Sequence, residues 1–144
     1  MRKAILMSIL SMVTLAGFAP ERKTLIIQTG QRIDPYAKIW EAVCYVESNN
    51  NPLAYNPAES ATGICQIRPI RLQDYNNRTK SKYRMKDCYN VEISKTIFYY
   101  YARQIGFRNQ DKIIRNWNGG ENGYKMKSTL KYSQKVKRHL NKAK

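Results

Sequence analysis

Apolar residues recur every three or four positions in four stretches of the chain, which is the spacing of an amphipathic helix. The first predicted helix begins at Asp34 and Pro35, an N-cap residue and a proline suited to the first turn, and ends at the polar run 49–51. The pattern predicts three further helices, over residues 89–105, 110–117 and 128–140. Gly106 stops the longest of these helices and Ser128 caps the last.

The segments between these helices are short or polar. Residues 53–69 hold apolar pieces broken by Asn56-Pro57, Gly63 and Pro69, a pattern typical of a loop and a small hairpin. Residues 71–86 are polar and basic, and we expect them to form a surface excursion that holds one helical turn. The predicted fold class is therefore mainly α, a small helical domain with a minor β-hairpin.

The first twenty residues follow a different pattern. Arg2 and Lys3 precede a largely apolar run over residues 4–18, which ends among small residues. This order is typical of a secretory signal peptide, and the run is short for a membrane span, which needs about 20 apolar residues. We predict a signal peptide over 1–19, a linker or disordered arm over 20–33 and one domain over 34–144. Export to the periplasm or the extracellular space follows, with an uncleaved N-terminal anchor as the alternative.

The composition narrows the partners. The chain has 144 residues, with 26 Lys and Arg against 10 Asp and Glu, a formal net charge of +16. Its 11 Tyr, 2 Trp and ordinary Gly and Pro content exclude a disordered or collagen-like chain. The positive charge indicates a polyanionic partner, namely nucleic acid, an anionic membrane or an anionic wall polymer. Export favours the wall or the envelope surface, and we expect no nucleic-acid partner.

The three cysteines, Cys44, Cys65 and Cys88, have no common zinc-binding spacing, and His139 is the only histidine. We therefore expect no metal and no cofactor. Export permits a disulfide, and the odd count leaves at least one thiol free. One disulfide and three small buried hydrophobic side chains both remain open at this point.

Glu47 is the carboxylate that differs from the others by its position. It lies four residues after Val43 and seven after Trp40, so it continues the apolar stripe of its helix. Burial there raises the pKa of a carboxyl group, which suits a general acid that protonates a leaving oxygen. The alternative from spacing alone is a carboxylate that extends into solvent or pairs with one of the 26 cations.

Glu47 opens the first of three sequence blocks that together match a known family pattern. Glu47-Ser48 is followed by Asn51-Pro52-Leu53-Ala54, then by Gly63-Ile64-Cys65-Gln66-Ile67-Arg68-Pro69, and later by Asn116-Trp117-Asn118-Gly119-Gly120. In this order they resemble the lytic transglycosylase domain of the soluble (SLT) type, a relative of goose-type lysozyme, over about residues 34–140. The family pattern reads E-S-x-x-N-P-x-A, G-x-x-Q-x-x-P and Y-N-x-G. The resemblance implies a lysozyme-like α+β fold with the hairpin beside the catalytic cleft.

The resemblance also assigns roles to single residues. It makes Glu47 the only catalytic acid and base, and it implies that Gln66 faces bound sugar and that Tyr132 reaches toward Glu47. Trp117 replaces the usual tyrosine and is expected to stack on a sugar face, while Cys65 replaces a frequent methionine. The implied substrate-binding set is Ser48, Gly63, Gln66, Trp117, Asn118, Gly120 and Tyr132.

The implied substrate is the glycan strand of peptidoglycan. The bond cleaved is the β-1,4 link between N-acetylmuramic acid and N-acetylglucosamine, and the product carries a 1,6-anhydro-muramyl end. A monomer with peripheral envelope association is expected.

Two alternatives keep the wall as the partner. A hydrolytic muramidase would need a second carboxylate, for which Glu59 and Asp74 are the candidates. A non-catalytic wall-binding domain would keep the fold without the chemistry. The basic run over 125–144 leaves nucleic-acid binding as a third class, although a solvated helix face accounts for such a run.

Overall fold

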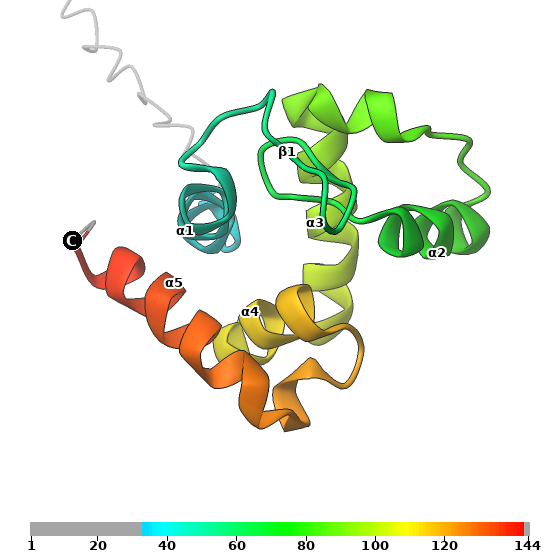
Figure 1. Cartoon of the computed structure of the whole chain (residues 1–144). Helices are drawn as coiled ribbons and strands as arrows, with labels where there is room; N and C mark the ends of the chain where they lie inside the picture. Colours follow the sequence, from blue (N-terminus) through cyan, green and yellow to red (C-terminus); the bar gives the residue numbers. More distant parts are fainter. Residues whose placement is uncertain (1–32, 143–144) are drawn as a thin grey trace, which may run out of the picture. The chain divides into compact units, whose positions relative to one another are not determined.

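Five α-helices and one short hairpin make up the part of the chain that the computed structural model describes, residues 33–142 (Figure 1). In chain order these elements are α1 (Ala37–Ser48), β1 (Tyr55–Asn56), β2 (Ala61–Thr62), α2 (Pro69–Thr79), α3 (Val91–Ile105), α4 (Gln110–Gly119) and α5 (Leu130–Lys142). Short 3₁₀ turns cover Met85–Tyr89, Gly123–Lys125 and Lys127–Thr129. The prediction of a mainly helical domain with a minor antiparallel hairpin is confirmed. The predicted signal peptide over 1–19, and the predicted arm up to residue 32, lie outside the described residues.

None of the helices between residues 33 and 142 is long and apolar enough to cross a bilayer.

Helix α1 begins later than predicted and ends where predicted. Residues 34–36 form a turn in which the backbone oxygen of Asp34 accepts from the Ala37 N–H at 3.3 Å and its carboxylate accepts from the Tyr36 N–H at 3.0 Å. The other carboxylate oxygen accepts from the Tyr99 hydroxyl at 2.6 Å. Asp34 therefore fixes the start of the helix from one turn before it. Residues 49 and 50 have φ of 54° and 62°, a left-handed backbone that cannot continue a right-handed helix.

The prediction of a surface excursion over 71–86 is wrong for its first half. Residues 69–79 form α2, with Pro69 in the first turn, where its missing N–H is not needed. Leu72 and Tyr75, three positions apart, are its only buried residues, so its apolar stripe is too narrow to stand out in the sequence. The helix ends at Lys80, which has φ of 61°.

The later helices follow the prediction with two corrections at α5. The side chain of Asn90 accepts from the N–H groups of residues 92 and 93 and so starts α3, and Gly106, with φ of 88°, ends it as predicted. Ser128 does not cap α5, because it lies inside the 3₁₀ turn Lys127–Thr129. Leu130, expected on the buried side of α5, is 45% exposed because it opens the helix at the edge of the domain.

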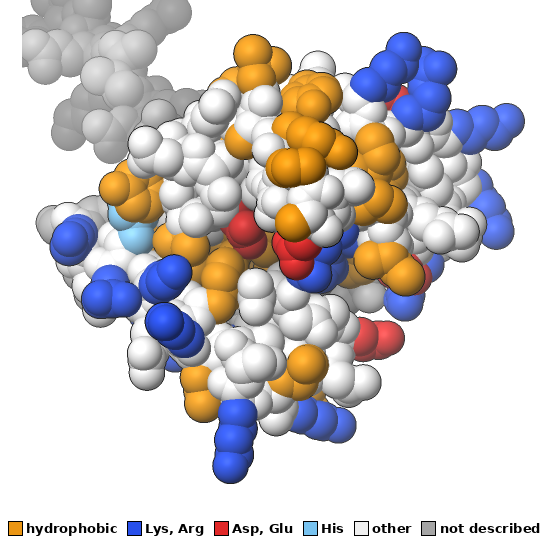
Figure 2. Space-filling view, in the orientation of Figure 1, with side chains coloured by type: hydrophobic (Ala, Val, Ile, Leu, Met, Phe, Trp, Pro, Cys, Tyr) orange, Lys and Arg blue, Asp and Glu red, His pale blue; other side chains and the backbone are white. Residues whose placement is uncertain are grey.

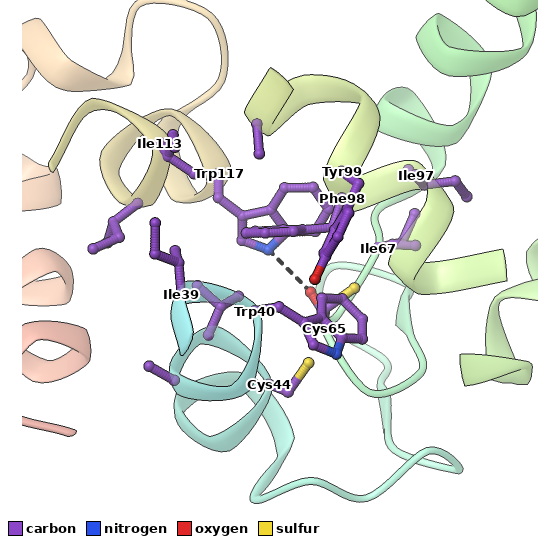
Figure 3. Close-up of a cluster of buried hydrophobic side chains, with 14 of the residues drawn as sticks. Ile39, Trp40, Cys44, Cys65, Ile67, Ile97, Phe98, Tyr99, Ile113 and Trp117 are labelled. Atoms are coloured by element: carbon purple, nitrogen blue, oxygen red, sulfur yellow. Dashed lines mark hydrogen bonds between the residues drawn. The ribbon is translucent and has the colours of Figure 1, made fainter. Parts of the chain in front are cut away.

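The core joins α1, α3 and α4 through aromatic rings (Figure 3). Trp40 of α1 packs against Phe98 of α3, with ring centroids 5.4 Å apart, and Phe98 packs edge-on against Trp117 of α4 at 5.0 Å. The Trp117 Nε1 donates a hydrogen bond to the carbonyl oxygen of Cys65 at 3.1 Å. This bond holds the loop after β2 against the centre of the core.

The three cysteines are free and buried. The structure therefore matches the alternative of three small buried hydrophobic side chains rather than that of one disulfide. Burial raises the pKa of every thiol, to about 12 for Cys88, so all three remain protonated near neutral pH.

Gly63 is required both by its backbone and by its surroundings. Its φ is +81°, and a Cβ atom there would lie 2.0 Å from the carbonyl oxygen of Cys88. We predict that Gly63→Ala lowers the free energy of unfolding by about 2 kcal/mol more than Gly106→Ala. Gly106 is the matched control, because its φ is +88° while a Cβ atom there would meet nothing within 4 Å. Urea unfolding of both variants measures the difference, and equal losses would contradict the packing argument.

Candidate active site

Glu47 is partly buried next to the C-terminal end of α1, in line with the buried side chains of Val43 and Trp40. Burial raises its pKa to about 7, and the carboxylate of Glu59 adds to the rise. A hydrogen bond from Tyr132 and the charge of Arg68 act in the opposite direction. The result is a carboxyl group that is about half protonated at neutral pH. Figure 2 shows acidic and basic side chains close together in a hollow at the middle of this face.

Tyr132 of α5 holds this carboxyl group in place. Its hydroxyl donates to Oε1 of Glu47 at 2.6 Å, across 85 residues of sequence. Burial and the neighbouring carboxylate raise the pKa of Tyr132 well above its usual value, so the phenol keeps its proton and remains a donor. The structure thus brings together the two residues that the resemblance placed in contact.

Ser48 ties α1 to the loop after β2. Its Oγ donates to the carbonyl oxygen of Ile64 at 2.7 Å, with a second, longer contact to that of Cys44 at 3.2 Å. Ser48 therefore positions the end of α1 and has no hydroxyl proton left for a ligand.

Gln66 closes the same loop from the inside. It has φ of 52°, and its Nε2 donates to the carbonyl oxygens of Gly63 at 3.0 Å and Ala54 at 3.3 Å. The Gly63 N–H also donates to Ala54, at 2.8 Å. The amide nitrogen of Gln66 is therefore used by the fold, and the amide oxygen is the atom left for a ligand.

The expected stacking of sugar on Trp117 does not fit its surroundings. The indole is only 5% exposed, with the guanidinium of Arg71 4.5 Å above the ring centroid and Phe98 against its edge. A ring enclosed in this way offers no free face. Trp117 supports the site through its hydrogen bond to Cys65, and its substitution for tyrosine removes a hydroxyl without opening a platform.

Asn118 and Gly120 lie at the edge of a cavity of about 770 Å³ between α2, α3, α4 and the segment after α4. Asn118 offers its backbone oxygen to a guanidinium nitrogen, Nη2 of Arg68. Gly120 has φ of +78° in open space, so glycine is needed for the backbone angle and not for close packing.

Arg68 and Arg71 are the site residues that the sequence pattern did not single out. Arg68 reaches Glu59 with Nη1 at 3.5 Å, and Arg71 donates to the backbone oxygens of Asn116 at 3.0 Å and Trp117 at 2.8 Å. Both arginines lower the pKa of Glu47. Both arginines lie at the start of α2. Because the sequence pattern did not predict this helix, it gave no reason to place them together at the site.

The two candidates for a second carboxylate differ. Glu59, in the hairpin turn, is 53% exposed at its side chain, and its charge raises the pKa of Glu47. Asp74 is partly desolvated, but hydrogen bonds at 2.8 Å from Arg78 and from Tyr101 hold its pKa below the usual value. Asp74 is therefore committed to the wall of the 770 Å³ cavity.

Comparison with protein families gives one result, and it agrees with this geometry. The model of the transglycosylase SLT domain matches residues 24–140, and the chain therefore belongs to the SLT transglycosylase domain family. Members of this family are generally lytic transglycosylases that act on peptidoglycan. The match begins inside the arm predicted over 20–33. No curated protein and no solved structure matches the chain significantly.

The burial of Glu47 has a measurable effect on stability. Its pKa is about 7 in the folded protein against a reference of 4.5, so the folded state binds more protons between these pH values. The free energy of unfolding therefore falls as the pH rises through this window, by up to about 3 kcal/mol. We predict that Glu47→Gln stabilises the protein at pH 8 and changes little at pH 4.

Urea unfolding at the two pH values tests this effect. Glu41→Gln, on the exposed face of α1, is the matched control. Equal behaviour of the two variants would show that Glu47 is not desolvated.

Proposed function

We propose that the chain is a lytic transglycosylase that cleaves the β-1,4 bond between N-acetylmuramic acid and N-acetylglucosamine. Glu47 is the single general acid and base, and the product carries a 1,6-anhydro-muramyl end. The observation that carries the proposal is a largely buried carboxyl group with its pKa raised to about 7, held at 2.6 Å by a phenol. Membership of the family supplies the substrate class.

The proposed reaction uses Glu47 twice, first as an acid and then as a base. Protonated Glu47 gives its proton to the bridging oxygen, and the bond from that oxygen to the anomeric carbon breaks. The N-acetyl oxygen of the substrate stabilises the cationic sugar centre, so a second protein carboxylate is not needed. Glu47, now ionised, takes the proton of the 6-hydroxyl group, whose oxygen closes on the anomeric carbon. The enzyme returns to its starting state without consuming water.

The residues around Glu47 have distinct parts in this proposal. Tyr132 fixes one carboxyl oxygen, so that the other faces the scissile bond. Gln66 offers its amide oxygen to the sugar, and Asn118 and Gly120 form the edge of the cleft on the side of α4. Ser48, Gly63 and Trp117 hold the loop after β2 in position. Trp117 therefore supports the site and does not itself contact the sugar.

The location of the protein belongs to the same proposal. We propose export through a signal peptide over 1–19, followed by an arm over 20–33 and the transglycosylase domain over 34–144. Action on the wall as a monomer, with peripheral association to the envelope, follows from the excess of positive charge.

A hydrolytic muramidase is the second candidate, because the charge of Glu59 acts on the pKa of Glu47. In that reaction Glu59 would activate a water molecule and the product would have a reducing end. Its carboxylate is occupied by the ion pair with Arg68 at 3.5 Å and is half exposed to solvent, which favours the reaction with a single carboxylate.

Analysis of the products by mass spectrometry separates the two reactions. Digestion of purified wall should release muropeptides with 1,6-anhydro ends, and Glu47→Gln should reduce their release by a factor of about 1,000. Glu59→Gln should retain activity and give the same anhydro products. Reducing ends would support hydrolysis, and undiminished release by Glu47→Gln would overturn the mechanism.

The dependence of the rate on pH tests the role of Tyr132. The acid form of Glu47 starts the reaction, so kcat/KM should fall as the pH rises above about 7. The hydrogen bond from Tyr132 favours the ionised form, so Tyr132→Phe should move this fall to higher pH and lower the maximal rate. Tyr100→Phe is the control, since its hydroxyl forms no hydrogen bond within residues 33–142. A pH profile unchanged by Tyr132→Phe would contradict the assignment.

A further inference from the structure

Helix α5 presents positive charge that the rest of the described structure does not neutralise. The helix has no acidic residue, and its basic residues are Lys131, Lys135, Lys137, Arg138 and Lys142. Lys137 pairs with Asp111 at 2.6 Å. Within residues 33–142, the other four form no salt bridge. A cationic surface of this kind is available for an anionic ligand.

Part of this charge lines a groove between α1 and α5. The groove has a volume of about 530 Å³, and its lining residues are Tyr45, Val46, Lys135, Arg138, His139 and Lys142. The Tyr45 ring is stacked on the imidazole of His139, with ring centroids 4.0 Å apart and planes 14° from parallel. Tyr45 lies at the edge of the groove and is 44% exposed, so its ring is accessible to a ligand. The groove therefore combines an aromatic surface with three cationic side chains and the imidazole.

The groove begins beside the candidate active site. Val46, in its lining, is the residue before Glu47, and Tyr132, which binds Glu47, lies one turn before Lys135. Along the helix axis Arg138 is about 9 Å beyond Tyr132. Figure 2 shows the chain's only histidine and several basic side chains on the same face as the acidic side chains at its centre, with hydrophobic side chains between them. A strand lying across Glu47 would reach this groove.

The cavity on the side of α2 has a different charge balance. There Arg78 pairs with Asp74 at 2.8 Å and approaches Glu121 at 4.0 Å. Of the four cations in its lining, Arg68 and Arg78 are paired with acidic side chains. Within residues 33–142, Lys135, Arg138 and Lys142 of the groove between α1 and α5 form no salt bridge.

We propose that the groove between α1 and α5 binds the carboxylates of the peptide stems that the glycan strand carries. The sugar rings of peptidoglycan bear hydroxyl and acetamide groups and no charge, so the strand itself offers nothing for three cations to pair with. Its anionic groups are on the stems, which are attached to the muramic acid rings. The assignment rests on the proposed function and names the part of the substrate that this end of the site recognises.

Sedimentation with wall material tests the groove separately from catalysis. The parent protein for the test carries Glu47→Gln, so it binds without cutting. The groove variant adds K135Q, R138Q and K142Q, and the matched control adds K80Q, K82Q and K86Q, which removes the same charge from exposed positions near the end of α2 and beyond it. The probes are purified sacculi, phosphatidylcholine vesicles with anionic phosphatidylglycerol, and stripped glycan. The stripped glycan is the same strand after an amidase has removed the stems and the lactyl carboxylates that this exposes have been converted to methylamides, so that it carries no charge.

The groove variant should bind intact sacculi about tenfold more weakly than the parent, and the control should keep most of the affinity. On stripped glycan the groove variant and the parent should bind equally. An equal loss by variant and control, or an equal loss on stripped glycan, would overturn recognition of the stems. Binding that is lost from vesicles instead of from sacculi would assign the groove to a membrane surface.

The same data separate this inference from the proposed function. If the parent binds neither sacculi nor stripped glycan, the wall is not its substrate and both proposals fail. If the parent binds both and the α5 charges make no difference, only the assignment of the groove fails.

Discussion

The hydrogen bond from the Trp117 indole to the Cys65 carbonyl oxygen is the contact on which the site depends. Trp117 is on α4, Cys65 is in the loop after β2, and Phe98 links both to Trp40 on α1. Three sequence blocks that are far apart in the chain therefore meet at one buried point. A buried indole N–H needs an acceptor, so the loop cannot leave α4 without exposing an unpaired donor. This constraint sets the position of Gln66 and of the loop carbonyls that hold Ser48.

The protonation of Glu47 results from opposing effects, of which burial is the largest. Burial and Glu59 favour the neutral acid, whereas Tyr132, Arg68 and Arg71 favour the carboxylate. Burial outweighs the hydrogen bond and the two arginines, which limit the rise, and the pKa is about 7. A group that must first give a proton and later take one back works best near this balance, because either form is then accessible at little cost in free energy.

Helix spacing, the resemblance of the blocks and the placement of Glu47 on an apolar stripe were sufficient to predict the helical fold and the contact with Tyr132. These features depend on local periodicity or on residue types at fixed separations. Helix α2 was not predicted because Leu72 and Tyr75 alone face the core, and two positions do not define a stripe. The contributions of Arg68 and Arg71 were missed for the same reason.

The role of Trp117 shows a different limit of the sequence. An aromatic residue beside a cleft is compatible with stacking on sugar and with packing in the core, and the residue type does not distinguish them. The position of Arg71 above the indole decides between the two, and Arg71 comes from a helix whose place in the fold has no sequence signature. The outcome depends on tertiary packing rather than on the local pattern.

The guanidinium of Arg68 connects the hairpin to α4. Arg68 contacts Glu59 on the hairpin and the backbone oxygen of Asn118 on α4, while its charge also acts on Glu47. A hairpin that swung away from α4 would separate Glu59 from Arg68 and change the field at Glu47 in the same movement. The width of the cleft and the proton affinity of its central acid are thus mechanically linked. A glycan strand that moved the hairpin away from α4 would therefore also change the pKa of Glu47.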